Sequence, residues 1–262
     1  MLENLGIPGI LELTTTKEYT QFVNKQQMGF FELNMSFPYF TSEKVIELFH
    51  SQEDISKIYS IHLPDNLDIA EFNPEIRDGN LNLIKNILCA IPKGSVKILN
   101  LHLQLGNRFT LPDKKCFFYQ LYEKVYLQNI VSSIQSLEPL LLEKSVLLCF
   151  ENTGICHFSF IQKALTEILK FNCCGLTWDI GHDAKSHYSD SKHFYTAHQE
   201  DIKHMHIHDF DGTLDHKELF TGDVNLHEVF NFLQTKKIKG VVETKNLPTL
   251  NASIEKIKAL SK

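Results

Sequence analysis

The chain has 262 residues, of which 43% are hydrophobic and 22% are charged, and its formal net charge is −6. This composition is typical of a globular protein and excludes an extensively disordered chain. The acidic balance argues against a generally basic nucleic-acid-binding surface, although it permits a local basic groove.

The N-terminal segment does not resemble a secretory signal. Glu3 stands where such a signal carries Lys or Arg, and Glu12 interrupts a short apolar stretch. The most apolar stretches elsewhere are broken by charges well before the roughly 20 residues needed to cross a bilayer. The six cysteines include no CxxC pair and no zinc-ribbon spacing, which predicts reduced thiols. We therefore expect a soluble, cytoplasmic protein without a membrane partner.

Short apolar runs alternate along the chain with longer amphipathic stretches. The eight runs occupy residues 9–13, 29–35, 57–63, 96–103, 146–151, 174–180, 202–208 and 240–244. Helical spacing of apolar residues is clearest at 114–143, 225–236 and 252–260. Parallel strands joined by crossover helices give this alternation, and such barrels commonly form one domain of about 250 residues. The sequence therefore predicts one α/β domain over residues 1–262, a (β/α)8 TIM barrel.

Alternate residues of these runs differ in polarity. In a barrel strand, one set of alternate side chains points into the barrel and the other set packs against the helices. In the run at 202–208, Met205 and Ile207 share one face, whereas the histidines at 204, 206 and 208 share the other. We therefore expect the histidines to point inward, with His204 packed deeper in its strand.

The same rule places a possible metal ligand at the end of six runs. These residues are His62, His102, Glu151, Asp179, His206 and Glu243. Catalytic groups of such barrels lie at the C-terminal ends of the strands, where a buried carboxylate without a cation would be costly. Each residue alone is compatible with a structural role, but six such roles would not be expected at the same end of six strands. Mixed oxygen and nitrogen ligands favour a divalent Mn, Co, Mg or Zn ion.

Several segments together resemble the xylose isomerase-like barrels, which include sugar epimerases, inosose dehydratases and the endonuclease IV group of DNA-repair enzymes. The segments are GFFEL, SIHLPDNLDIA, LNLHLQLG, CFENTG, LTWDIGHD, HMHIHDFDG, HKELFTGDVNL and VVETK. Their order and spacing carry the resemblance, which covers nearly the whole chain.

The resemblance implies roles for particular residues. In the epimerases of this family the metal is held by the Glu of the EN segment, the Asp of the DxGH segment, the His of the HxxD segment and the Glu of the last strand. Here these are Glu151, Asp179, His206 and Glu243, with His208 as an alternative to His206. The predicted substrate-binding residues are His62, His102, His182 and His216. The family's Gly-x-Gly loop is Phe220-Thr221-Gly222 in this chain, which leaves the substrate contacts of that loop open.

The first functional hypothesis is a metal-dependent isomerase or epimerase acting on a ketose or a related polyol. A bound cation would polarise neighbouring carbonyl and hydroxyl oxygens and stabilise an enediolate. Glu151 and Glu243 would then serve as acid and base. The expected partner is a small sugar-like molecule.

The second hypothesis is an endonuclease IV-like phosphodiesterase that acts on abasic-site DNA, the only hypothesis in which nucleic acid is a partner. The four predicted substrate-binding histidines match further metal ligands of that group. However, the endonuclease IV group has a His in its first strand, and this chain has none there. That group also has an Asp two residues before its last histidine ligand; the corresponding residue here is Leu214, and Asp215 is adjacent. Few basic residues other than Arg108 lie near the expected rim, where phosphates would need them.

The third hypothesis is a barrel that has lost catalysis and only binds a small ligand. The retention of both Glu151 and Glu243 argues against it.

Overall fold

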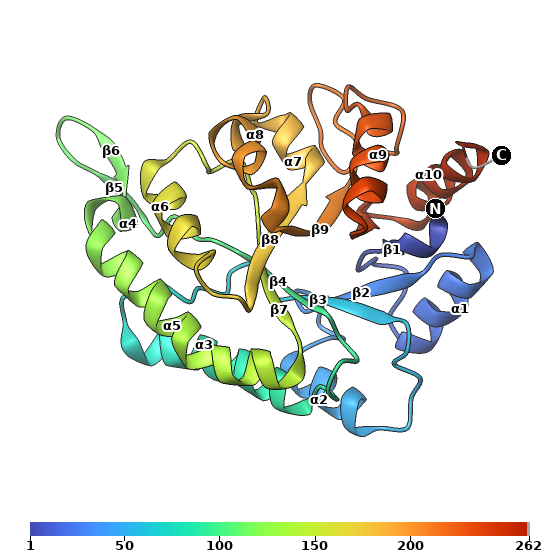
Figure 1. Ribbon diagram of the computed structural model, residues 1–262, viewed down its shortest axis with the longest axis horizontal. Coiled ribbons are helices and arrows are strands. Elements are labelled where there is room, and N and C mark those ends of the chain that lie inside the picture. Colours follow the sequence, from blue (N-terminus) through green and yellow to red (C-terminus); the bar gives the residue numbers. More distant parts are fainter. Residues whose placement is uncertain (261–262) are drawn as a thin grey trace.

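The computed structural model describes residues 1–260, which form a closed barrel of eight parallel strands (Figure 1). The barrel strands are β1 (Leu5–Ile7), β2 (Phe30–Asn34), β3 (Ile58–His62), β4 (Ile98–His102), β7 (Leu147–Glu151), β8 (Cys174–Asp179), β9 (Ile202–Ile207) and β10 (Lys239–Val242). Each strand pairs with the next along the chain. β1 pairs with β10 through Leu5 and Gly240, and this pairing closes the ring. The predicted (β/α)8 barrel is confirmed.

Helices surround the strands or follow their C-terminal ends (Figure 1). They are α1 (Thr16–Gln26), α2 (Ser42–His50), α3 (Pro74–Ala90), α4 (Phe118–Leu121), α5 (Glu123–Lys144), α6 (Ser159–Ile168), α7 (Ile180–Lys185), α8 (Ser189–His193), α9 (Leu226–Lys236) and α10 (Leu247–Leu260). Two short 3-10 helices occupy Leu2–Asn4 and Tyr195–Asp201. None of the helices within residues 1–260 is long and apolar enough to cross a membrane.

The first strand lies earlier in the chain than the sequence predicted. It is Leu5–Ile7, whereas residues 9–13 leave the strand and turn toward α1, with Leu11 67% exposed. The backbone N–H of Ile10 donates a hydrogen bond of 2.8 Å to the hydroxyl of Tyr19, which ties this turn to α1. The prediction of a strand at 9–13 was wrong because the true strand, Leu5–Ile7, is only three residues long. The turn that follows it contains a longer apolar run, which the sequence pattern favoured.

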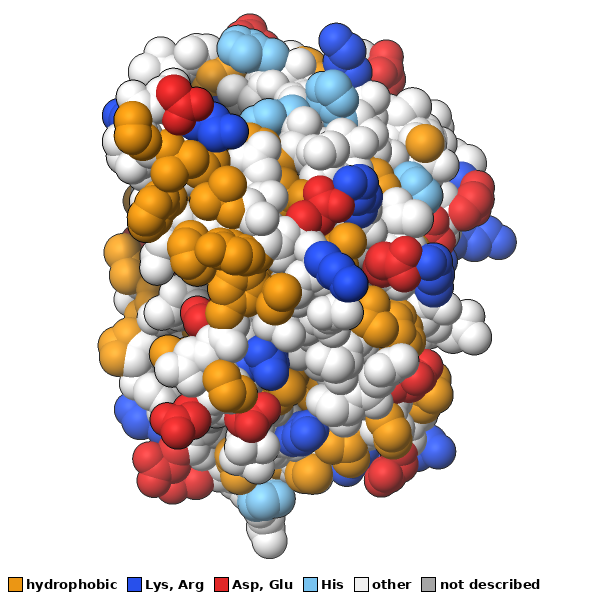
Figure 2. Space-filling view, turned by 90° about the vertical axis from the view of Figure 1, so that its left-hand side faces the viewer, with side chains coloured by type: hydrophobic (Ala, Val, Ile, Leu, Met, Phe, Trp, Pro, Cys, Tyr) orange, Lys and Arg blue, Asp and Glu red, His pale blue; other side chains and the backbone are white. Residues whose placement is uncertain are grey.

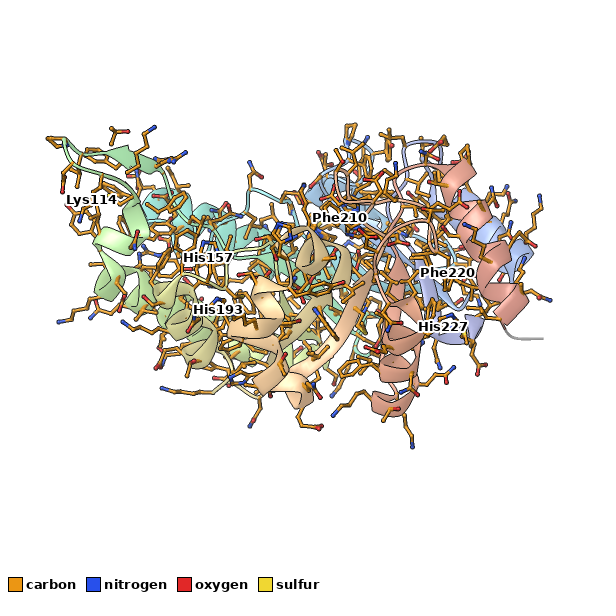
Figure 3. The ribbon with its side chains drawn as sticks, turned by 90° about the horizontal axis from the view of Figure 1, so that it is seen from above. Lys114, His157, His193, Phe210, Phe220 and His227 are labelled. Carbon is orange, nitrogen blue, oxygen red and sulfur yellow. The ribbon has the colours of Figure 1, made fainter. Side chains whose placement is uncertain are left out.

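An antiparallel hairpin replaces the predicted start of the long helix at residue 114. Its strands are β5 (Arg108–Thr110) and β6 (Lys115–Phe117), and the helix itself begins at Glu123. Lys114 lies at one side of the molecule and Phe220 at the other when the barrel is seen from above (Figure 3). Figure 2 shows hydrophobic side chains grouped on the hairpin side, where Phe109 is 47% exposed.

The alternation within β9 is as predicted. Met205 and Ile207 are fully buried members of the hydrophobic core, and Ile207 lies close to Leu233 of α9 around Gly240. His204 and His206 contact Glu32, which comes from β2, so both rings lie inside the barrel. The interior of the barrel is therefore polar toward its C-terminal end, while its outer wall is apolar.

Candidate metal centre

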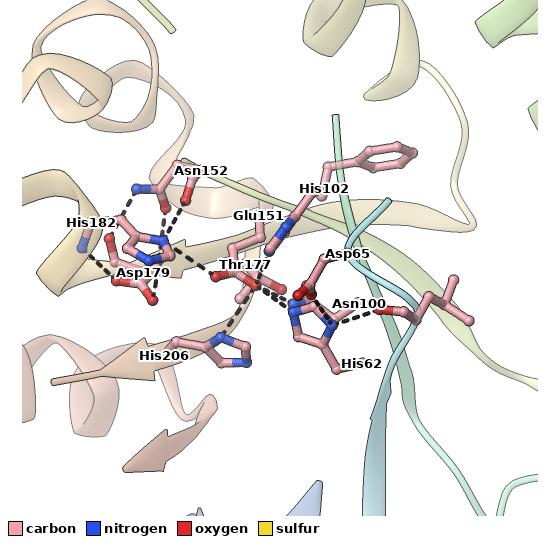
Figure 4. Close-up of polar contacts among 12 residues, drawn as sticks. His62, Asp65, Asn100, His102, Glu151, Asn152, Thr177, Asp179, His182 and His206 are labelled. Carbon is pink, nitrogen blue, oxygen red and sulfur yellow. Dashed lines mark hydrogen bonds and ion pairs between the residues drawn. The ribbon is translucent and has the colours of Figure 1, made fainter. Parts of the chain in front are cut away.

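Four side chains from neighbouring strands converge at the C-terminal mouth of the barrel. Glu151 ends β7, Asp179 ends β8, His206 lies in β9 and Glu243 directly follows β10. All four are buried, and one donor atom of each lies within 4.8 Å of the other three. The Nδ1 atom of His206 is 3.2 Å from Glu151 Oε2 and 3.1 Å from Glu243 Oε2. The residues predicted as metal ligands thus meet at one point, which we call the quartet; three of them are labelled in Figure 4.

Buried carboxylates need compensating positive charge. Burial alone would raise the pKa of Glu151, but His206 and His102 hold this pKa well below its usual value. The pKa of Glu243 is also lowered despite burial, because Lys245 Nζ lies 2.7 Å from its Oε1 and His206 is close. Burial would lower the pKa of His206, yet the surrounding carboxylates raise it well above its usual value. A proton on His206 therefore offsets part of the negative charge of both glutamates, and a cation bound among these side chains would take the place of that proton.

Asp179 is held in place by three neighbours. The amide of Asn152 accepts a hydrogen bond from the backbone N–H of Asp179 (2.7 Å) and donates one to its carbonyl (2.9 Å). The carboxylate accepts from the backbone N–H of His182 at 2.7 Å and lies 3.0 Å from His208 Nε2. The backbone N–H of His216 donates to His208 Nδ1, so a neutral His208 carries its hydrogen on Nε2 and donates it to Asp179. Both nitrogens of His208 are used, which favours His206 as the ligand.

Gly181 leaves the space that the His208 ring occupies. A Cβ atom at position 181 would lie 2.0 Å from two atoms of that ring. Gly181→Ala should therefore push His208 away from Asp179 and weaken the affinity for a divalent ion about tenfold, as loss of a ligand's supporting hydrogen bond does. Competition for Zn²⁺ with a chromophoric chelator measures this affinity. Gly79→Ala is the matched control, because a Cβ at Gly79 meets nothing within 4 Å. An unchanged affinity in Gly181→Ala would show that His208 does not support Asp179.

Some buried polar atoms of this centre are in ion-pair contact but form no hydrogen bond of suitable geometry. In the described part of the chain, these atoms are His206 Nδ1, Glu243 Oε2 and His102 Nε2. A cation between them would satisfy these atoms, and three carboxylates with one imidazole suit Mn, Co, Mg or Zn. The residues present therefore fit a divalent metal ion.

Three further histidines, His62, His102 and His182, lie within 3.7 Å of the Glu151 carboxylate (Figure 4). The Nε2 atoms of His62 and His102 lie 3.5 Å and 3.3 Å from Glu151 Oε2. His62 Nδ1 lies 2.7 Å from the carbonyl of Leu63 and donates to it, which leaves Nε2 facing the carboxylate. Burial would lower the pKa of His62, but Glu151 raises it to about 9. His62 and His102 form a second group of possible donors together with Asp65.

His182 and His216 lie on the other side of the quartet. They belong to a third group of possible donors within 4.8 Å of one another. His182 Nε2 is 3.9 Å from Asp215 Oδ2, and His216 Nδ1 donates to the carbonyl of Glu243 at 3.1 Å. Burial lowers the pKa of His216 to about 4, so its ring is neutral at pH 7 with Nε2 free to accept. The structure thus places His62, His102, His182 and His216 around the quartet, and their binding of substrate stays a prediction.

Three residues that contact the quartet were not assigned to the site from the sequence. Glu32 in β2 lies 3.2 Å from His206 Nε2, Asn100 in β4 donates to Glu151, and Lys245 forms the ion pair described above. Glu32 and Asn100 lie on the inward face of their strands, so strand alternation could have identified both. Lys245 follows the last strand, where no periodic signal exists.

A cavity of about 510 Å³ opens among the loops that follow β4 and β7, and none of the quartet residues lines it. Gln104 and Thr153, which follow β4 and β7, line it together with the aromatic side chains of Phe72, Phe118 and Tyr119. Its volume lies within the range of roughly 300–1,000 Å³ for small-molecule sites. The lining includes no Lys or Arg from the described residues.

Asp209 organises the loop that departs from the family's Gly-x-Gly. Its carboxylate accepts hydrogen bonds of 2.8 to 3.1 Å from the backbone N–H groups of Phe210, Thr221, Gly222 and Val224. Phe220 has a φ of 62°, in the left-handed region that glycine adopts most readily. The loop therefore makes a left-handed turn although its first residue is phenylalanine.

A family model described as a xylose isomerase-like TIM barrel matches residues 27–260. No curated protein matches the chain. The fold is similar to that of a D-tagatose 3-epimerase-like protein, with a TM-score of 0.74, 20% sequence identity, and coverage of 97% of this chain and 96% of that one.

Two other solved structures share the fold. The 3-keto-D-glucoside 4-epimerase from E. coli has a TM-score of 0.73 and 13% identity, and the match covers 98% of each chain. The IOLI protein with a bound zinc atom has a TM-score of 0.67 and 14% identity, with coverage of 98% of this chain and 96% of that one. At these identities the similarity shows the fold.

Proposed function

Because the chain belongs to the xylose isomerase-like TIM barrel family, we propose that it is a metal-dependent isomerase or epimerase acting on a ketose or a related polyol. The observation that carries this proposal is the convergence of the four quartet side chains within 4.8 Å at the barrel mouth. Two proteins of similar structure, a D-tagatose 3-epimerase-like protein and a 3-keto-D-glucoside 4-epimerase, support a sugar substrate. A divalent ion held by the quartet would polarise the carbonyl and hydroxyl oxygens of such a substrate.

Glu151 and Glu243 are the groups we assign to proton transfer. Their lowered pKa values keep both ionised at neutral pH, so either can accept a proton. One carboxylate takes the proton from the carbon beside the carbonyl, and the electrons of that C–H bond form the enediolate. In an isomerisation, the same carboxylate returns the proton to the former carbonyl carbon, and the hydroxyl proton on the neighbouring carbon moves to the former carbonyl oxygen, so that the carbonyl shifts by one carbon. In an epimerisation, the other carboxylate relays a proton from solvent to the opposite face of the enediolate, and the first carboxylate then releases its proton to solvent.

The rim cavity supports an uncharged substrate. Gln104, Asn107 and Asp68 offer hydrogen-bonding groups for hydroxyls, while Phe72 and Tyr119 offer ring faces and edges. A phosphodiester would need cations beside it, and this lining provides none from the described residues. The lining of this cavity therefore suits a sugar better than a nucleic acid, whereas the smaller cavity beside His182 is lined by a cation, Lys185.

The two additional donor groups favour a second candidate, an endonuclease IV-like phosphodiesterase. The group of His62, Asp65 and His102 and the group that includes His182 and His216 could hold further ions beside the quartet. A cluster of ions would activate water and stabilise the leaving oxygen of a phosphodiester. Lys185 lines a smaller cavity of about 340 Å³ together with His182, and its Nζ lies 2.8 Å from Asp215 Oδ2 in the same lining.

Metal content separates the two candidates. Purified without chelator, the protein should carry close to one divalent ion per chain by elemental analysis, and removal of that ion should abolish turnover in a panel of ketoses. Re-addition of Mn²⁺ or Co²⁺ should restore it, because the donor set accepts these ions. Two or three ions, together with incision of a duplex containing one abasic site, would support the phosphodiesterase instead. An intact duplex is the control, and a protein with no ion and neither activity would contradict both candidates.

A further inference from the structure

Glu32 is a buried acidic side chain to which the proposed reaction gives no role. It lies in the middle of β2 with only 2% of its surface exposed. Its neighbours in the strand, Phe31 and Leu33, are fully buried on the opposite, outer face. A carboxylate inside the barrel is costly unless it is ionised against a partner or hydrogen-bonded, so its contacts indicate what it does.

The contacts of Glu32 centre on His206. The two carboxylate oxygens lie 3.2 Å and 3.4 Å from His206 Nε2, and Ser60 donates a hydrogen bond of 2.7 Å to Oε2. His204 Nε2 lies 3.4 Å from the same carboxylate. His204 donates from Nδ1 to the carbonyl of Lys239 at 3.1 Å, so a neutral His204 has no hydrogen on Nε2 to give. His206 and Ser60 are therefore the donors to Glu32.

The two nitrogens of His206 face different partners. Nδ1 points at Glu151 and Glu243 in the quartet, whereas Nε2 points at Glu32. An ionised carboxylate only accepts hydrogen bonds, so the hydrogen of a neutral His206 ring belongs on Nε2. Nδ1 then carries the lone pair, and a metal ligand needs a lone pair at the atom that binds.

We propose that Glu32 is a positioning residue that fixes the Nε2–H tautomer of His206 and holds the ring with Nδ1 aimed at the metal. This inference rests on the proposed function, because it assumes that the quartet binds a divalent ion. Glu32 comes from β2 and His206 from β9, so the barrel brings together two residues that lie far apart in the sequence. Carboxylates that accept the second N–H of a ligating histidine raise its basicity and fix its orientation.

The test compares metal affinity in three proteins. Glu32→Met removes the acceptor with little change in length, and its Zn²⁺ affinity, measured by competition with a chromophoric chelator, should be about 100-fold weaker than that of the wild type. Glu32→Gln keeps an amide oxygen for Nε2–H and for Ser60 but loses the charge, so we expect about tenfold weaker binding. Partial rescue by Gln separates positioning from loss of the fold. The visible spectrum of bound Co²⁺ should also change in Glu32→Met, because the geometry of the histidine ligand changes.

Leu33→Val is the control for a loss of stability alone. It perturbs the outer face of β2 and leaves Glu32 in place, so its Zn²⁺ affinity should equal that of the wild type. Affinities of Glu32→Met and Glu32→Gln within twofold of the wild type would overturn the positioning role while leaving the metal site intact. If Glu32→Met does not fold, Glu32→Gln decides by the same criterion. A wild-type protein that binds neither Zn²⁺ nor Co²⁺ would overturn the proposed function and this inference together.

Discussion

Glu151→Gln should lower the turnover of any ketose that the wild-type protein converts by about a thousandfold or more. Glu151 lies at the centre of the site: its carboxylate is within 3.5 Å of a ring nitrogen of His62, His102 and His206. The amide keeps the shape of the side chain but can neither take up a proton nor balance the surrounding positive charge. The variant should therefore lose activity and bound metal together.

Three measurements check this expectation. Steady-state kinetics gives the loss of turnover, elemental analysis gives the bound metal, and circular dichroism shows whether the barrel is still folded. Glu47→Gln is the matched control, because Glu47 is exposed on α2 and should behave as the wild type. Turnover within tenfold of the wild type in Glu151→Gln would remove this residue from the mechanism.

Asp209→Ala should reduce the free energy of unfolding by about 3 kcal/mol. The Asp209 side chain is buried, and its carboxylate accepts four backbone hydrogen bonds that hold the loop between β9 and α9. Alanine leaves these N–H groups without an acceptor. Gly222 allows close packing there, because a Cβ at this position would lie 2.1 Å from the carbonyl oxygen of Phe210. Urea unfolding followed by tryptophan fluorescence measures the change.

Two further variants define the origin of that loss. Asp209→Asn keeps one acceptor oxygen and should lose about half as much stability, because two of the four bonds go to each carboxylate oxygen. Asp78→Ala is the control, since Asp78 is exposed on α3. Equal stability of Asp209→Ala and Asp78→Ala would show that the carboxylate does not hold the loop.

The architecture and the quartet could be predicted because both depend on a local period. Alternation within strands placed Met205 and Ile207 outside and the β9 histidines inside, as the structure confirms. It also placed Glu151, Asp179 and Glu243 at the same end of their strands. A strand of three residues shows no such period, which is why β1 was misplaced. The turn around Pro112 and Asp113, between β5 and β6, was a signal for the hairpin that the helical reading overlooked.

The contacts that tune the site could not be predicted in this way. Glu32 and His206 meet across the barrel, and no local pattern links strands that are so far apart in the sequence. The same is true of Asn152, which joins the end of β7 to Asp179 through two hydrogen bonds. The roles of these residues follow from the closed ring of strands and not from any segment by itself.

The pairing of β1 with β10 also bears on the order in which the molecule is completed. Glu243 directly follows β10, so a chain emerging from the ribosome exposes Glu151 and Asp179 well before the last donor is made. β1 cannot form its pairing with β10, which closes the ring, until β10 has been synthesised. An ion held by all four donors would consequently bind only after β10 has been synthesised and the ring has closed.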